Sequence, residues 1–237
     1  MRRIINMTRG FMFLICIALM LSCSNHKVQT DVLYQVNSFD ILMQGNYDGN
    51  WLYDDVLENG DFGIGSFDRL NGEMVLVDGQ MFRIHASGEA QQTDTGESAC
   101  IATLCWFMED FEFEVQNLSI EELKQKIKTQ LPDTTLFYAI RIEGEFEAIT
   151  TRSIYPQEKP YRPLPEVLAE EVRRESADVT GTGVGFLAPS HVQGAVWKGF
   201  HFHFLSDDHS FGGHIINFVI RNAVVKIDIL NQLNLIL

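Results

Sequence analysis

Three histidines in the last third of the chain have the spacing of a metal site. His201 and His203 flank a single phenylalanine, and His214 follows 11 residues after the second of them. Because residues two apart on a β-strand share a face, the first two imidazoles are expected to project together. The turn-rich segment 207–213 predicts a hairpin that brings His214 back beside them. Three imidazoles meeting in this way leave open coordination positions, the usual form of catalytic zinc.

The pattern alone does not fix the metal or the role. A lone His-x-His pair more often packs or hydrogen-bonds within a core, and imidazole also binds iron, copper and nickel. A third histidine after Gly212-Gly213 strengthens the metal interpretation. The remaining histidines have no comparable neighbours, and we expect the one in the turn, His209, to be a solvated loop residue.

The elements that would position these side chains are mostly strands. Asp78-Gly79 is a hairpin signal between apolar segments at 74–77 and 81–84. Segment 100–115 suits one or two strands, and Glu143-Gly144 predicts a turn between two more. The further strands that the apolar and β-branched runs predict are residues 135–142, 145–154, 181–188, 200–206, 214–220 and 224–230.

Two helices are predicted between the strands. Ser119 and Glu122 form a capping box before apolar residues at helical spacing, and a second helix is expected at 166–175 after a proline-rich connection. Many strands with few helices indicate an α+β or mixed α/β fold, built on mixed or antiparallel sheets.

The charge balance restricts the partners. The 237 residues include 18 Lys plus Arg against 32 Asp plus Glu, a net charge of −14. This argues against nucleic-acid binding, which requires a basic surface. An acidic protein that takes an anionic substrate needs a metal or a well-placed arginine in its site.

The N-terminus has the features of an export signal. Three arginines precede an apolar run at 11–21, which is too short for a membrane-spanning helix. The sequence Met-Leu-Ser-Cys at 20–23 resembles a lipobox, so residues 1–23 are expected to be a signal peptide with Cys23 lipid-modified. Residues 24–31 would then be a tether. The protein is expected to be exported, as a membrane-anchored lipoprotein of a bacterial cell envelope or otherwise secreted or periplasmic. The remaining cysteines, Cys100 and Cys105, are expected to be small buried hydrophobes.

Several segments together resemble one enzyme family. The histidine segment 199–208 with Gly212-Gly213-His214, and the glycine-rich segment 60–67 with Leu70-Asn71-Gly72-Glu73-Met74, resemble the two signatures of α-acetolactate decarboxylases. Shorter matches occur in the family's order at 34–35, 45–49, 137–139, 160–163 and 185–189. The resemblance therefore covers nearly the whole chain after the signal.

The resemblance implies a zinc enzyme. The family's metal ligands fall on His201, His203 and His214, its active-site glutamate on Glu73, and its active-site arginine on Arg152. It also implies two lobes within 32–237, with a boundary near 135–165 and the metal site between them, and a homodimer. The motif departs from the family at Asn71, which replaces an aspartate. Family members also usually continue into a polar tail that supplies a further glutamate, so we expect that role to be unfilled in the present sequence.

The implied reaction is decarboxylation of 2-acetolactate to acetoin and carbon dioxide, a carboxy-lyase reaction. A zinc-stabilised enediolate would carry the electron pair, Arg152 would bind the carboxylate or enediolate, and Glu73 would deliver a proton. One alternative is an exported metal-dependent small-molecule binding protein, derived from the family without turnover. A cupin-like oxygenase would require a later histidine motif, which the sequence does not contain after His214.

Overall fold

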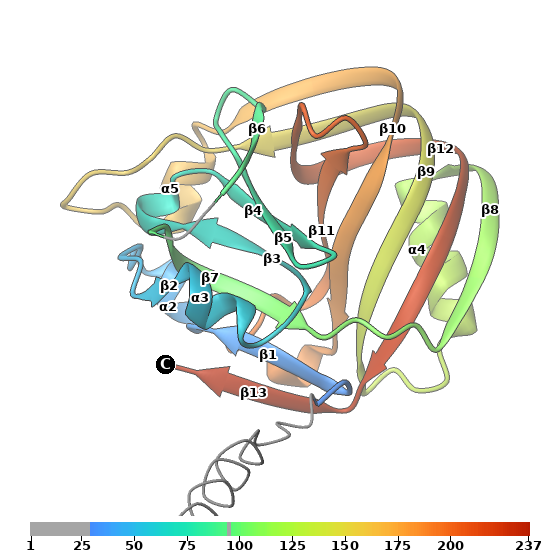
Figure 1. Ribbon diagram of the computed structural model, residues 1–237, viewed down its shortest axis with the longest axis horizontal. Helices are drawn as coiled ribbons and strands as arrows, with labels where there is room; N and C mark the ends of the chain where they lie inside the picture. Colours follow the sequence, from blue (N-terminus) through green and yellow to red (C-terminus); the bar gives the residue numbers. More distant parts are fainter. Residues whose placement is uncertain (1–28, 94–95) are drawn as a thin grey trace, which may run out of the picture.

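The computed structural model describes residues 29–93 and 96–237, which form two β-sheets with a few short helices (Figure 1). The fold class predicted from the sequence is confirmed. The predicted signal peptide and its Cys23 lie outside the described residues. Within the described part, no helix is long and apolar enough to cross a membrane.

The first sheet contains the N-terminal strands and the last strand of the chain. Its order is β13-β1-β7-β3-β4-β5-β6, with β2 paired to β7. The first and last strands lie side by side in parallel, and every other pair is antiparallel (Figure 1). The strands are β1 (Val32–Val36), β2 (Trp51–Leu52), β3 (Phe62–Phe67), β4 (Glu73–Val77), β5 (Gln80–Ile84), β6 (Ala90–Gln92), β7 (Ser98–Cys105) and β13 (Gln232–Ile236).

The second sheet is antiparallel and contains three long strands. Its order is β11-β10-β9-β12-β8, and β11 also pairs with the start of β12. The strands are β8 (Phe111–Ser119), β9 (Phe137–Ser153), β10 (Val172–Ala188), β11 (Gly199–Ser206) and β12 (Gly212–Leu230). The additional pairing places the second half of β11 beside the start of β12, and the three histidines lie around this contact.

The helices are short except for one. They are α2 (Phe39–Met43), α3 (Tyr53–Leu57), α4 (Ile120–Gln130) and α5 (Leu164–Leu168), with 3-10 turns η1 (Asp68–Leu70) and η2 (Ser190–Val192). The capping box predicted at the start of α4 is present: Ser119 accepts from the backbone of Glu122, and the Glu122 carboxylate accepts from Ser119 N at 2.8 Å. The apolar side of α4 packs on the second sheet through Leu123 and Ile127.

A separate apolar cluster joins the two sheets. It combines Phe62 and Val75 of the first sheet with Val184 and Phe186 of the second, all essentially buried. Burying apolar area at roughly 25 cal/mol per Å² is the main force that holds two such layers together. This packing fixes β4 against β11, and that contact positions the candidate site.

The predicted hairpin at Asp78-Gly79 is confirmed, but the turn predicted at Glu143-Gly144 is wrong, because β9 runs through it without a break. The two strands expected at 214–220 and 224–230 are likewise one continuous strand, β12. Gly144 serves packing instead, because a Cβ there would lie 2.2 Å from the carbonyl oxygen of Asn222 in the neighbouring strand. A glycine inside a strand often marks such a close approach of backbones.

The predicted helix at 166–175 is also wrong in extent. α5 ends at Leu168, and the chain enters β10 at Val172, where Arg173 and Arg174 pair with residues of β9. Strand pairing overrides the helical propensity of this segment.

The chain passes from the first sheet to the second between Cys105 and Phe111 and returns for β13. The lobe boundary expected near 135–165 stays a prediction.

Candidate active site

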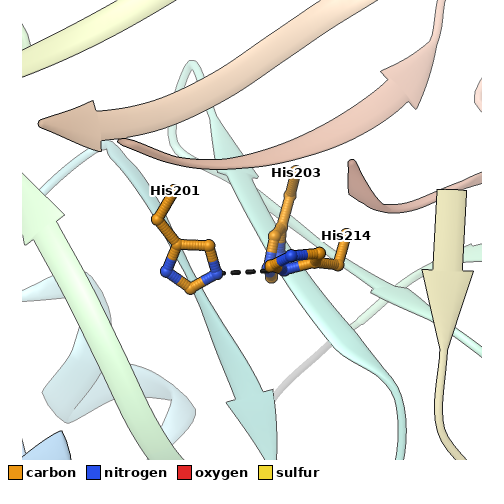
Figure 2. A group of neighbouring side chains, drawn as sticks. All are labelled: His201, His203 and His214. Atoms are coloured by element: carbon orange, nitrogen blue, oxygen red, sulfur yellow. Dashed lines mark hydrogen bonds between the residues drawn. The ribbon is translucent and has the colours of Figure 1, made fainter. Parts of the chain in front are cut away.

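The three histidines singled out by their spacing converge at one point. His201 and His203 project from the same face of β11, and His203 lies directly across from His214 of β12 (Figure 2). One ligand nitrogen from each imidazole lies within 4.8 Å of the others. His201 Nε2 and His214 Nδ1 are 3.1 Å apart, the contact drawn as a dashed line in Figure 2.

The Gly212-Gly213 pair explains how His214 reaches this position. A Cβ on Gly212 would lie 2.1 Å from the carbonyl oxygen of Phe204, and Gly213 has φ +140 with its Cβ position 2.7 Å from the carbonyl oxygen of Arg152. Only glycine tolerates both the positive φ and the close approach. The two glycines therefore allow β12 to start tightly against β11 and β9, which places the His214 ring beside His203.

The hydrogen bond of His203 leaves one of its nitrogens free to bind a cation. Its Nδ1 lies 2.8 Å from the carbonyl oxygen of Met74. Because a carbonyl only accepts, Nδ1 carries the proton and the neutral ring keeps its lone pair on Nε2. That Nε2 is buried and has no hydrogen-bond partner among the described residues. A buried polar atom is rarely left in this state, and a bound metal would satisfy it.

The protonation of the triad suits metal ligation. Burial lowers the pKa of His203 to about 3 and lowers the pKa of His201 and His214 well below the ordinary value. The neighbouring Arg152 charge acts in the same direction. Neutral imidazole is the form that binds metal, so the three residues fit a divalent ion such as zinc.

Glu73 and Arg152 lie next to the histidines and contact each other. Arg152 Nη1 donates to Glu73 Oε1 at 2.9 Å, and Glu73 Oε2 lies 3.6 Å from His203 Nε2. Both side chains are about nine-tenths buried. Burial raises the pKa of Glu73, although Arg152 opposes the shift. The carboxyl group can therefore hold a proton nearer to neutrality than an exposed glutamate does.

The local backbone directs both of these side chains. Glu73 begins β4 directly after Gly72, whose φ is +91, and Ser66 Oγ donates to the Gly72 carbonyl at 2.8 Å. Arg152 is paired with His214 in the β9–β12 ladder. Side chains of directly opposed strand residues lie on the same face. The turn and the ladder together bring residues 73 and 152 to the same wall as the triad.

Glu171 is a neighbour of the site that the sequence reasoning missed. Its carboxylate lies 3.2 Å from Arg152 Nε, on the atom that Glu73 does not contact, and it also pairs with Arg173. The residue was expected within a helix, and no local pattern distinguishes it from the glutamates around it. Only the early start of β10 brings it beside Arg152.

A cavity opens in front of these groups, lined by both sheets and by α2 and α5. Its polar side holds the triad, Glu73 and Arg152 together with Gln35, Ser66 and Thr103. Gln35 is buried and accepts from Thr103 Oγ1 at 2.7 Å. Most of its apolar lining belongs to one cluster, formed by Phe39, Leu42, Leu70, Ile154, Leu164 and Leu168, and Trp197 packs against Phe39. The cavity therefore has a charged end and an apolar end.

Other residues considered in the sequence have structural roles. His209 is exposed in the turn, with its ring against Phe82. Cys100 and Cys105 are buried, free thiols, and burial raises the pKa of Cys100 to about 12. They are the small buried hydrophobes that the sequence predicted.

Comparison with known proteins gives a consistent result across the chain. The family model described as alpha-acetolactate decarboxylase matches residues 33–237. The alpha-acetolactate decarboxylase of Bacillus licheniformis is 35% identical over 206 residues, which cover 86% of this chain and 81% of that protein. The enzyme of the same description from Methanosarcina mazei is 36% identical over 201 residues, covering 84% of this chain and 70% of the relative.

Solved structures show the same similarity in three dimensions. The crystal structure of alpha-acetolactate decarboxylase from Bacillus subtilis superposes with a TM-score of 0.84 at 34% identity, covering 86% of this chain and 88% of that one. A Staphylococcus aureus protein of unknown function, described as similar to alpha-acetolactate decarboxylase, gives a TM-score of 0.85 at 28% identity with the same coverage.

Proposed function

The chain belongs to the alpha-acetolactate decarboxylase family, and we propose that it converts 2-acetolactate to acetoin and carbon dioxide at the His201–His203–His214 site with zinc bound there. The observation that carries the metal part of the proposal is the buried, unpartnered Nε2 of His203, which faces two further imidazoles. When bound, zinc acts as a Lewis acid that stabilises negative charge on the substrate's oxygens.

Arg152 is the residue placed to bind the anionic end of the substrate. A guanidinium carries five N–H donors, of which one donates to Glu73, while Glu171 forms an ion pair with Nε. The remaining donors match the two oxygens of a carboxylate in a planar fork. Because the chain carries a net charge of −14, this buried cation also supplies the local attraction that an acidic protein otherwise lacks.

Glu73 is the residue placed to return a proton. Loss of carbon dioxide breaks the bond between the carboxylate and the hydroxyl-bearing carbon, and the electron pair moves onto the adjacent ketone oxygen to give an enediolate. One proton must then be added to the carbon that lost the carboxylate. Glu73 is buried beside Arg152 and His203, and burial raises its pKa, which favours the protonated form that can give this proton; solvent then restores it after each turnover.

The apolar end of the pocket contributes by excluding water. Leu42, Ile154 and Leu164 are buried residues that line the cavity within one apolar cluster. A low-dielectric surround strengthens each electrostatic contact that the substrate makes with Arg152 and Glu73. It also limits the access of solvent protons, so that the proton comes from one defined side.

The experiment that tests this function is acetoin formation from racemic acetolactate by the purified protein from residue 24 onward. We expect turnover with added zinc and its loss after treatment with a chelator. Absence of turnover in a folded, zinc-loaded sample would contradict the decarboxylase proposal.

We also propose that the enzyme is exported and held at the membrane by a lipid on Cys23. The arginine-rich start, the apolar run at 11–21 and the lipobox-like residues 20–23 support this proposal. Labelling of the full-length protein with radioactive palmitate in a bacterial host, compared with Cys23→Ala, tests it. Equal labelling of the two proteins would rule out lipidation at Cys23.

A homodimer is the assembly that we propose from the family relationship. Light scattering of the purified protein gives its mass in solution directly. A mass near twice 27.0 kDa less the signal supports the dimer, and a single-chain mass contradicts it.

A further inference from the structure

The cavity ends in a side chain that the reaction itself does not require. Trp197 lies in the loop between η2 and β11 and lines the cavity together with the triad. The residue before it, Val196, is 2% exposed and belongs to the core between the sheets, whereas Trp197 is 37% exposed. An indole that faces both the cavity and solvent stands at the mouth of the pocket.

The contacts of Trp197 connect the two ends of the pocket. Its ring meets Phe39 of the apolar end edge-on, with centroids 4.8 Å apart and an interplanar angle of 78°. Its other neighbour is the imidazole of His201, with centroids 5.3 Å apart. The indole therefore covers the side of the pocket where a substituent bound near the triad would extend toward solvent.

The loop that carries Trp197 is fixed to α2. Phe39 N donates to the carbonyl of Ala195 at 3.0 Å, and Asp40 N donates to the carbonyl of Gly194 at 2.9 Å. Moving the loop outward would break these bonds, and rotating the indole alone would expose the apolar face that Phe39 and Trp197 share. The side chain therefore acts as a fixed wall, and a fixed wall sets a size limit.

One part of the substrate, its alkyl group, can be selected by size at such a wall. A 2-alkyl-2-hydroxy-3-oxo acid has its oxygens at one end, and the polar side of the cavity holds Arg152, Glu73 and the triad. With the oxygens directed to that side, the alkyl group on the hydroxyl-bearing carbon faces the apolar side, which Trp197 closes. On the basis of the proposed function, we propose that Trp197 is a specificity-determining residue that limits the length of this alkyl group.

The expected effect follows from the loss of the wall. Trp197→Ala replaces the indole with a methyl group, so longer alkyl groups no longer contact an indole at the mouth of the cavity. Two additional methylenes that gain an unobstructed apolar site change relative affinity by about tenfold or more. Trp197→Phe keeps an aromatic wall of smaller size and should give an intermediate shift.

The test uses unreactive ligands so that it does not depend on turnover. Zinc-loaded wild-type protein and the Trp197→Ala, Trp197→Phe and Trp51→Phe variants are titrated by calorimetry with 2-alkyl-2,3-dihydroxybutanoates whose alkyl group is methyl, ethyl or propyl. In these ligands a hydroxyl replaces the ketone, so they cannot lose carbon dioxide. Trp51 packs in a different cluster, against the far side of the first sheet, and serves as the matched control. Acetoin formation from acetolactate is measured on the same samples.

We expect the ratio of propyl to methyl affinity to rise by at least about tenfold in Trp197→Ala and to stay at the wild-type value in Trp51→Phe. An unchanged ratio in a zinc-loaded Trp197→Ala or Trp197→Phe sample overturns the proposal. Should Trp197→Ala fail to fold, the phenylalanine variant decides. Absence of acetoin together with a shifted ratio refutes the decarboxylase function alone, because the size limit is measured by binding.

Discussion

Glu73→Gln separates proton delivery from every other role of this site. Glutamine has nearly the same shape, and its carbonyl oxygen can still accept from Arg152 Nη1, which now lies 2.9 Å from the carboxylate. It cannot donate a carboxylic proton to carbon. We therefore expect the variant to fold and bind zinc but to form acetoin at a rate reduced by about 100-fold to 10,000-fold, the usual contribution of a general acid.

We expect Glu73→Gln to cost less stability than the loss of a buried ion pair usually does. Removing one partner of such a pair generally costs about 3–5 kcal/mol, because the other charge is left unpaired. Here Glu171 lies 3.2 Å from Arg152 Nε and continues to neutralise the guanidinium. Because the amide still accepts from Arg152, only the charge of the acceptor is lost, and a cost of about 1 kcal/mol, the difference between a charged and a neutral hydrogen bond, is expected from urea unfolding.

Glu171→Gln is the matched control, because it removes the other carboxylate from the same arginine. Glu171 contacts Arg152 through Nε, on the opposite side from Glu73. We expect a stability loss of similar size and a rate reduction below about tenfold. Should Glu73→Gln retain a rate within about fivefold of wild type while folded and zinc-loaded, Glu73 is not the proton donor. Equal, large rate losses in both variants would assign the effect to Arg152 instead.

Three further predictions concern the framework of the site. Gly213→Ala forces a Cβ to within 2.7 Å of the Arg152 carbonyl oxygen at φ +140, so we expect a loss of about 1–3 kcal/mol in urea unfolding and weaker zinc binding by calorimetry. Asp228 is buried and its pKa is raised to about 7, whereas the unfolded chain releases that proton near pH 4. Wild-type stability should therefore fall as pH rises from 4 to 7. In Asp228→Asn the urea midpoint should depend less on pH between pH 5 and 8. Ser119→Ala removes the N-cap of α4 and should cost about 1 kcal/mol in urea, with no effect on zinc affinity.

The side chains of the site could be predicted from the sequence, but not all of their surroundings. The His-x-His alternation and the Gly-Gly before His214 are local signals, and the strands that they predict are the ones that carry the triad. The family motifs added Glu73 and Arg152, whose contact spans 79 positions of sequence and has no local signature. Their roles in the reaction stay predictions until they are measured.

The missed features depend on pairing between distant segments. Gly144 has the sequence appearance of a turn, but its function is to let β12 approach β9, and only the register of the sheet shows this. Residues 169–175 have helical propensity, but β9 pairs with the chain from Val172 onward as a strand, and this places the preceding Glu171 beside Arg152. Trp197 has no motif around it, and the role proposed for it depends on the cavity that it lines and on its ring contacts with Phe39 and His201.

A zinc titration of the metal-free protein, with acetoin formation and bound zinc recorded at each addition, decides whether the three histidines hold a catalytic metal. Turnover should rise linearly and reach its plateau at one zinc per chain. His203→Ala, which loses the ligand that Met74 orients, should neither bind that zinc tightly nor gain activity. Turnover in the metal-free wild type, or full activity of His203→Ala after zinc addition, would contradict a catalytic metal at the three histidines.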